Sequence, residues 1–251
     1  MAQECLHTLS EDRLLDGRIR LLQPLDGFRA AIDPVLLAAM VPCCARSVLD
    51  AGCGSGAASL CLAWRNRECR ITGLDIQPDL TGLYERNASL NGMKERMVSI
   101  TADIATMHSP DNAERFDCVM TNPPFLPEGR GNPSPVAPKA RAHVENEADL
   151  VCWLNSCVRM LRPRGTLCLI HRADRVDSII SCLNGAVGEI LLFPLWPKKD
   201  RPAKRILIRG RKGVATPATV HHGLVLHEDD GRYTADADNI LRNGMGLVTR
   251  T

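Results

Sequence analysis

The chain has 251 residues, of which 45% are hydrophobic and 24% charged, and its formal net charge at pH 7 is +2. This length suits one α/β domain with additions, or at most two small domains, and the composition is that of a globular protein with a core. A net charge this small excludes a chain that is basic throughout, so any nucleic-acid contact must come from local clusters of Lys and Arg.

Eleven cysteines raise the question of a metal site or disulfides, but their spacing favours neither. Cys43 and Cys44 are adjacent, and no Cys-x-x-Cys occurs anywhere in the sequence. The first 17 residues carry charges throughout and lack the apolar core of a secretory signal. No run approaches the roughly 18 apolar residues of a membrane span. We therefore expect a cytoplasmic protein with reduced thiols, no metal site and no membrane partner.

The N-terminal part has three predicted segments. Residues 1–17 are polar, and we expect them to be frayed or loosely helical. Residues 18–22 alternate in polarity and predict a short strand, followed by a turn over residues 24–27. Asp33 then stands as a helix N-cap, with Pro34 at the first helical position.

From residue 47 onward, strands alternate with helices. The predicted strands are residues 47–52, 70–76, 97–103, 116–122, 166–172, 189–195 and 204–210. The predicted helices are residues 56–67, 80–92, 148–165 and 174–185. The last two strands have no helix between them, so they should run antiparallel, with one strand inserted back into the sheet. The pattern predicts an α/β fold with a Rossmann-like, doubly wound, seven-stranded sheet whose last strand is antiparallel.

A glycine loop follows the first of these strands, in the sequence VLDAGCGSGAASL. Gly52, Gly54 and Gly56 let the turn adopt unusual backbone angles and let a ligand approach the main chain without a Cβ in the way. The helix that follows presents unpaired N–H groups to such a ligand. Gly52, Gly54 and Ala57 also satisfy a dinucleotide fingerprint, so the glycines alone do not choose between cofactors.

Acidic residues near the ends of successive strands favour S-adenosylmethionine. Asp50 would repel a pyrophosphate but suits the cationic amino acid end of that cofactor. Asp75 lies 19 residues after Gly56, where an acid can bind both ribose hydroxyls, and Asp103 can accept from an adenine amino group. The carboxyl ends of parallel strands are where α/β folds bind ligands.

The fourth strand ends in Asn122-Pro123-Pro124-Phe125. Proline fixes φ and removes N–H donors, so the carbonyls of this turn point in set directions. An exocyclic amino group could donate one hydrogen bond to the Asn122 oxygen and another to the Pro123 carbonyl. Phe125 could stack on the ring that carries the amino group. We interpret this turn as the catalytic element that aligns a weakly nucleophilic planar nitrogen with a methyl donor.

Over residues 45–210, these motifs resemble the class I S-adenosylmethionine-dependent methyltransferases of the amino-methylating group. Over nearly the whole chain, residues 17–42, the glycine loop, NPPF and KARAHVE resemble bacterial tRNA1(Val) (adenine-37-N6)-methyltransferases. The resemblance implies that residues 1–45, with Asp33, close the cofactor pocket, that 46–213 form the catalytic domain, and that 214–251 are an extension packed on it. It also implies that Cys53, Ile76, Ile104 and Asn122 line the cofactor site. The sequence departs from the family in having Phe125 for the usual tyrosine and a stretched Arg141-Ala142-His143-Val144-Glu145 run.

A second cluster of features predicts contact with tRNA or another structured RNA. Residues 194–213 hold eight basic residues and one acid, and the loop 196–203 should emerge on the active-site edge with Trp196 at its root. The long Pro- and Gly-rich loop after Phe125 should order over a flipped adenine. The predicted RNA contacts are Arg130, Lys139, Arg141, Lys198, Lys199, Arg201, Lys204 and Arg205. His221, His222 and His227 are expected at the surface, and Trp153 in the core.

Several functions stay open beside adenine N6 methylation. The same turn serves protein glutamine N5-methyltransferases and rRNA guanine-N2 methyltransferases, and DNA adenine methylation is disfavoured because no target-recognition domain is apparent. An NAD-dependent oxidoreductase and a non-catalytic RNA-binding protein are the alternatives from other classes. The expected oligomeric state is a monomer or a weak dimer.

Overall fold

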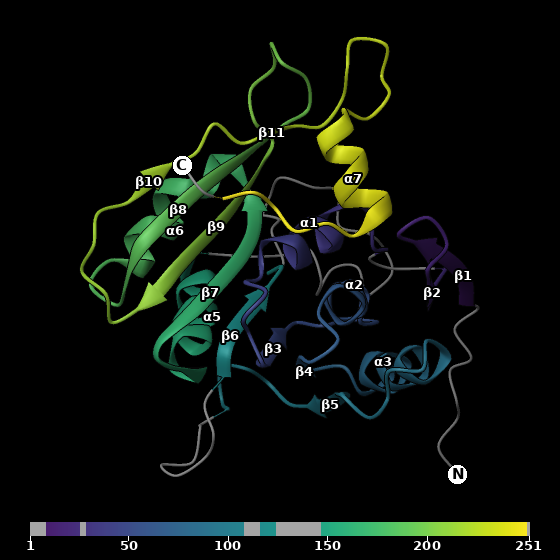
Figure 1. Ribbon diagram of the computed structural model, residues 1–251. Helices are drawn as coiled ribbons and strands as arrows, with labels where there is room; N and C mark the ends of the chain where they lie inside the picture. The colour runs from purple at the N-terminus through teal and green to yellow at the C-terminus, as the bar shows by residue number, and fades with distance from the viewer. Residues whose placement is uncertain (1–8, 26–28, 108–115, 124–146, 250–251) are drawn as a thin grey trace.

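The structure of the protein, a computed structural model, describes residues 9–25, 29–107, 116–123 and 147–249 (Figure 1). The strands are β1 (Leu9–Leu14), β2 (Ile19–Pro24), β3 (Ser47–Ala51), β4 (Arg70–Asp75), β5 (Met97–Thr101), β6 (Phe116–Thr121), β7 (Leu161–Arg172), β8 (Val187–Trp196), β9 (Arg205–Lys212), β10 (Thr219–Val220) and β11 (Leu224–Val225). The α-helices are α1 (Asp33–Met40), α2 (Ala57–Arg65), α3 (Pro78–Leu90), α5 (Glu147–Met160), α6 (Val176–Leu183) and α7 (Ala235–Asn243).

The main sheet has the order β10-β8-β9-β7-β6-β3-β4-β5, with β11 also paired to β8. Strand β9 is antiparallel to both of its neighbours, β7 and β8, whereas the other pairings are parallel. The Rossmann-like sheet with an inserted antiparallel seventh strand is therefore confirmed. The two short strands β10 and β11 extend that sheet at one edge.

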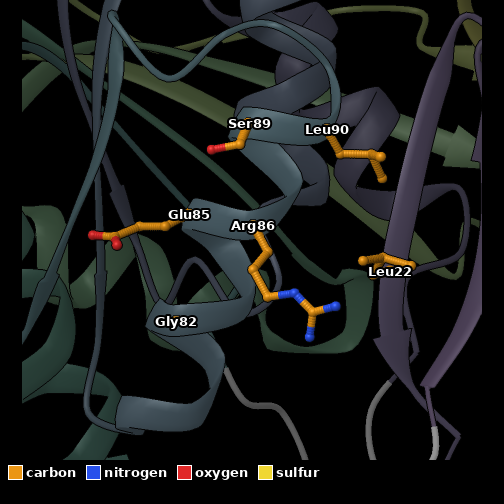
Figure 2. Close-up of a pocket in the computed structure, with 6 residues that line it drawn as sticks. All are labelled: Leu22, Gly82, Glu85, Arg86, Ser89 and Leu90. Atoms are coloured by element: carbon orange, nitrogen blue, oxygen red, sulfur yellow. The ribbon is translucent and has the colours of Figure 1, made fainter.

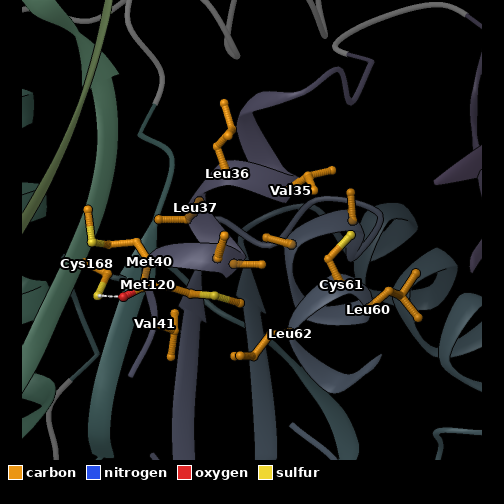
Figure 3. Close-up of a cluster of buried hydrophobic side chains, with 14 of the residues drawn as sticks. Val35, Leu36, Leu37, Met40, Val41, Leu60, Cys61, Leu62, Met120 and Cys168 are labelled. Atoms are coloured by element: carbon orange, nitrogen blue, oxygen red, sulfur yellow. Dashed lines mark hydrogen bonds between the residues drawn. The ribbon is translucent and has the colours of Figure 1, made fainter. Parts of the chain in front are cut away.

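Helices cover both faces of the sheet and contribute buried apolar side chains to a core cluster on each face. Helices α1, α2, α3 and α7 contribute to a first core cluster, and Figure 3 shows the part where Met40 of α1 lies beside Met120 of β6 and Cys168 of β7. Helices α5 and α6 pack on the opposite face and form a second cluster with residues such as Leu49, Val119 and Leu167. In the described residues, no helix is long and apolar enough to cross a membrane.

The N-terminal segment differs from its prediction. Residues Leu9–Leu14 form β1, antiparallel to β2, rather than a frayed or helical segment. The pairing brings Arg20 and Glu11 into a 2.8 Å ion pair, while Ile19 and Leu21 are buried in the first core cluster. Sequence-local reasoning fails here because the polar strand is stabilised by its partner and by the core beneath β2, and not by its own composition.

Asn87 of α3 and Asn91, the C-cap residue of that helix, bind the β2 backbone. The Asn87 side chain accepts from Leu22 N at 2.8 Å and donates to Leu22 O at 2.8 Å and to Ser55 O at 2.9 Å. One turn later, Asn91 accepts from Arg20 N and donates to Arg20 O. The i, i+4 spacing puts both amides on one helix face, so they satisfy backbone groups of β2 that β1 does not pair.

The predicted helix 148–165 ends earlier than expected. Helix α5 stops at Met160, and β7 begins at Leu161, paired with Phe116 of β6. Lys212 of β9 donates to Leu161 O at 2.8 Å, and Arg164 has φ +60°. Pro163 cannot donate a helical hydrogen bond, so the backbone leaves the helix before it.

One of the three histidines expected at the surface is buried. His221 is 6% exposed, its ring stacks on Phe193 at 4.6 Å, and its Nδ1 accepts from Gly223 N at 3.0 Å. Burial and the neighbouring His222 lower the pKa of His221. The residue is buried because β10 and β11 both pair with β8, a tertiary contact that composition does not signal.

Candidate active site

The site is assembled at the edge where the parallel strands end. Strand β3 runs into the glycine loop, β4 ends at Asp75, and β6 is followed by Asn122. Ala51 of β3 is in register with Leu74 of β4 and with Thr121 of β6. The elements predicted to bind cofactor and acceptor therefore lie on neighbouring strands of one sheet edge (Figure 1).

The glycine loop is held down on β4. Gly52 N and Cys53 N both donate to Leu74 O, at 2.8 and 3.0 Å. All three predicted glycines have positive φ: +75° at Gly52, +53° at Gly54 and +92° at Gly56. These backbone angles strongly favour glycine.

The three glycines face different surroundings. An added Cβ at Gly52 would lie 3.0 Å from Trp153 Cζ2, and one at Gly56 would lie 2.8 Å from Tyr84 Cδ2. At Gly54 an added Cβ would meet no atom of the described residues within 4 Å. Gly52 and Gly56 thus permit close packing inside the protein, whereas the side of Gly54 is open to a ligand.

Asp50 lies beneath this loop and is 2% exposed. Ser59 Oγ donates to Asp50 Oδ2 at 2.7 Å. Burial raises the pKa of Asp50 to about 7, and the nearby Asp75 carboxylate adds to that rise while the Ser59 hydrogen bond opposes it. A buried carboxylate without a cationic partner among the described contacts is suited to the cationic end of a ligand.

Asp75 receives backbone donors on both oxygens. Gly54 N donates to Oδ2 and Gln77 N donates to Oδ1, each at 3.0 Å. Burial raises the Asp75 pKa, and these N–H groups counteract that rise. A carboxylate has about four acceptor positions, so Asp75 keeps acceptor capacity for a hydroxyl donor.

The remaining predicted cofactor residues are placed unequally. Asp103 follows β5 and accepts from Ala105 N at 2.8 Å through Oδ1. Ile76 is 63% exposed beside Asp75, where it can present an apolar surface to a ring, whereas Ile104 is buried in the second core cluster. The Cys53 thiol is buried in the first cluster, and burial raises its pKa well above the ordinary value. Only the backbone of Cys53 is therefore well placed for a ligand.

Asn122 follows the end of β6, and its Oδ1 is buried without a hydrogen-bond partner among the described residues. Pro123, next in the chain, is also buried. An acceptor oxygen left unpaired in a buried position is unfavourable by about 1–3 kcal/mol, and such atoms call for a functional explanation. Pro124 and Phe125 lie outside the described residues.

Trp153 is a site neighbour that sequence reasoning places only in the core. It packs partly against the second core cluster, and its Nε1 also donates to Thr121 Oγ1 at 2.9 Å. No local signal distinguishes this tryptophan from a core residue, because its role depends on which strand α5 packs against.

The prediction that Asp33 is a helix N-cap is wrong. Ile32 occupies the cap position without a side-chain cap hydrogen bond, and Asp33 lies in the first turn of α1. Its Oδ2 instead accepts from Arg205 Nε at 3.0 Å. Helix α1 begins one residue earlier than predicted because Pro34 is tolerated at either of the first two positions.

The basic cluster of residues 194–213 is divided by the fold. Because β8 runs parallel to the other strands, the loop after Trp196 emerges on the site edge, as predicted. Strand β9 then runs antiparallel to its neighbours. Arg211 and Lys212 therefore lie at the amino-terminal end of the parallel strands, away from the site, near Arg164 and Leu161.

The RNA-contact residues predicted near the site edge have different environments. Lys199, Arg201 and Lys204 are exposed, whereas Lys198 Nζ donates to Asp229 O at 2.9 Å. Arg130, Lys139 and Arg141 lie outside the described residues.

A separate hollow of about 490 Å³ lies between α3 and β2. Figure 2 shows Arg86 and Leu90 of α3 and Leu22 of β2 at this hollow, with Glu85 and Ser89 pointing to the other side of the helix. None of these residues belongs to the predicted site.

Comparison with known proteins places this arrangement in a family. The family described as "Methyltransferase domain" matches residues 45–190. The tRNA1(Val) (adenine(37)-N6)-methyltransferase of Aeromonas hydrophila is 28% identical over 82% of this chain and 85% of its own length. A release factor glutamine methyltransferase of Chlorobaculum tepidum is 28% identical over 62% of this chain and 55% of its own length.

Among solved structures, a predicted O-methyltransferase from Agrobacterium tumefaciens superposes with a TM-score of 0.70. That similarity spans 87% of this chain and 99% of the other, at 24% identity, and shows a shared fold. The chain belongs to the methyltransferase-domain family. It is an S-adenosylmethionine-dependent methyltransferase with the class I, Rossmann-like fold.

The residues described here fit that cofactor. The open side of Gly54 leaves room at the main chain, and Asp50 and Asp75 supply carboxylates within the same loop region. Exposed Ile76 adds an apolar surface beside Asp75.

Proposed function

We propose that this methyltransferase modifies an exocyclic amino group, and that its acceptor is adenine N6 in a tRNA. The observation that carries the proposal is the Oδ1 of Asn122, directly after β6, which is buried and has no hydrogen-bond partner within the described part of the chain. A planar amino group could donate a hydrogen bond to this oxygen. Relatives named tRNA1(Val) (adenine(37)-N6)-methyltransferase, 28% identical over about four fifths of the chain, support adenine as the base.

The proposed chemistry depends chiefly on alignment. When bound, S-adenosylmethionine supplies an activated methyl group. Asn122 Oδ1 and the Pro123 carbonyl would each accept a hydrogen bond from the amine, which draws the nitrogen toward tetrahedral geometry. The nitrogen takes the methyl group as the bond from that group to sulfur breaks, and it then releases one proton to solvent. Fixing that geometry can contribute several kcal/mol of barrier lowering. Phe125 is proposed to stack on the base.

Asp50, Asp75 and Asp103 are proposed to hold the cofactor together with the Gly54 backbone. Asp50 would face the cationic amino acid end, Asp75 the ribose hydroxyls and Asp103 the adenine amino group. The exposed basic residues Lys199, Arg201 and Lys204, on the loop between β8 and β9, would contact phosphates. An RNA substrate of this kind implies action in the cytoplasm.

The proposal is tested by incubating the protein with labelled S-adenosylmethionine and total tRNA, followed by nucleoside analysis. We expect label in N6-methyladenosine with the wild type and none with Asn122→Ala, while both proteins bind S-adenosylmethionine with similar affinity by calorimetry. Label in methylguanosine, or only in protein glutamine, would replace adenine with the guanine or glutamine alternative. Full activity of Asn122→Ala would refute the role given to that side chain.

A further inference from the structure

Trp153 lies outside the site and contacts both the end of β6, next to Asn122, and the glycine loop after β3. Its Nε1 donates to Thr121 Oγ1 at 2.9 Å, and the Thr121 hydroxyl donates in turn to Ala51 O at 2.8 Å. The edge of the same indole ring packs on the glycine loop, since a Cβ added to Gly52 would lie 3.0 Å from Cζ2 and 3.2 Å from Cη2. One side chain of α5 therefore touches the ends of both β3 and β6.

This contact lies directly beside the two functional segments of the site. Thr121 and Ala51 are register partners at the last positions of β6 and β3, and both are 0% exposed. Gly52 comes directly after Ala51 and opens the glycine loop, and Asn122 comes directly after Thr121. The Thr121 hydroxyl accepts a hydrogen bond from Trp153 and donates one to Ala51, so its rotation is fixed. These bonds connect the ends of β6 and β3 in addition to the backbone hydrogen bonds between the strands.

We infer that Trp153 and Thr121 are positioning residues that set the separation between the glycine loop and Asn122. The inference rests on the proposed function, since it requires Asn122 to hold the acceptor. Transfer between two bound groups depends on their alignment, and a displacement of about 1 Å can lower the rate about 100-fold. The indole and hydroxyl act through the residues they hold and need not touch either substrate.

A purely structural tryptophan makes a different prediction. Trp153 also packs against the second core cluster, so its replacement should lower stability in either case. Trp64 offers a matched control, because it is likewise a partly buried tryptophan packed against the first core cluster, where its ring contacts Gly244. If Trp153 had only a structural role, replacing Trp153 or Trp64 would lower stability and leave kcat per folded molecule unchanged in both cases.

The test compares Trp153→Phe, Thr121→Val, Thr121→Ser and Trp64→Phe. Trp153→Phe keeps a ring but removes the N–H donor, and Thr121→Val removes the hydroxyl at nearly constant shape. We expect each to lower kcat about ten-fold or more, with the KM for S-adenosylmethionine nearly unchanged. Thr121→Ser should restore most of the activity, and Trp64→Phe should leave kcat at the wild-type value. Because the two groups form one bridge, the double variant should lose little more than either single variant.

A second measurement does not depend on turnover. In ¹⁵N-labelled protein, the side-chain amide resonances of Asn122 should shift or broaden in Trp153→Phe and Thr121→Val but not in Trp64→Phe. Unchanged kcat and unchanged Asn122 resonances in Trp153→Phe would overturn the inference, as would a Thr121→Ser variant as impaired as Thr121→Val. Failure of the proposed function is seen separately, in a wild type that forms no N6-methyladenosine.

Discussion

Arg205 Nε donates to Asp33 Oδ2 at 3.0 Å and so joins the start of β9 to the first turn of α1. Asp33 is predicted to close the cofactor pocket and Arg205 to contact RNA, so the ion pair connects the two predicted sites. The side chains of Arg205 and Asp33 are 34% and 17% exposed, respectively. A charge neutralised in this way contributes less to phosphate binding than a free one.

Replacing Arg205 should therefore act differently from replacing a neighbouring exposed lysine. Arg205→Ala should leave Asp33 without this partner and weaken S-adenosylmethionine binding, with little effect on the salt dependence of tRNA binding. Lys199→Ala should leave cofactor binding unchanged and reduce the slope of log K against log salt by about one. Filter binding at several salt concentrations measures both slopes. Equal slope changes in the two variants would show that Arg205 contacts phosphate directly.

The Asp50 carboxyl should make stability pH-dependent in the cofactor-free protein. Its pKa is raised by burial from 3.8 to about 7, so between those values the folded state holds a proton that the unfolded state has lost. Stability contributed by this group therefore falls as pH rises from about 4 to 7 and then levels off. Asp50→Asn should remove this part of the slope, as measured by thermal unfolding from pH 5 to 8.5.

The same carboxyl should couple cofactor affinity to pH. If Asp50 binds the cationic end of S-adenosylmethionine, affinity should rise as pH passes through 7 and the carboxylate ionises. Calorimetric titrations at several pH values measure this change. An affinity independent of pH in the wild type, or one unaffected by Asp50→Asn, would contradict the role given to Asp50.

Substitutions at two glycines of the loop should have different effects, with Gly56→Ala lowering mainly stability and Gly54→Ala lowering mainly cofactor affinity. Gly56→Ala places a Cβ 2.8 Å from the buried Tyr84 ring at φ +92°, so we expect a stability loss of roughly 2–5 kcal/mol. The methyl group of Gly54→Ala, at φ +53°, meets no atom within 4 Å in the part of the chain that the structure describes, so the stability loss should be about 1 kcal/mol. Gly54→Ala should nevertheless weaken S-adenosylmethionine binding, because the new methyl group occupies the open side. Unchanged affinity in Gly54→Ala would place the cofactor elsewhere.

Asn87 of α3 and the C-cap residue Asn91 provide another matched pair. Asn87 is fully buried and bonds Leu22 N, Leu22 O and Ser55 O, so Asn87→Ala leaves three backbone groups without these partners. We expect a stability loss of roughly 3 kcal/mol or more, together with weaker cofactor binding, because Ser55 belongs to the glycine loop. Asn91→Ala, at a more exposed position, should lower stability less and leave cofactor affinity unchanged. Denaturant unfolding and calorimetry distinguish these results.

The alternation of strands and helices was predictable because hydrophobic periodicity is a local property. Glycines at three alternate positions after a strand, and prolines after another, likewise mark turns by their own backbone limits. The polar strand β1 escaped prediction because its stability comes from pairing with β2. His221 was misplaced for a similar reason, since only the packing of β10 and β11 on β8 buries it.

The sequence by itself determined the chemistry available at the site: the glycine loop, the acids near strand ends and the Asn122-Pro123 turn. Tertiary structure alone decided which of these groups share a contact. Gly54 meets Asp75, Arg205 meets Asp33, and Trp153 meets both Thr121 and Gly52. These residues are far apart in the chain, and their distances depend on strand order, register and helix packing. Such relationships arise from the folded chain as a whole, whereas motifs depend on adjacent residues.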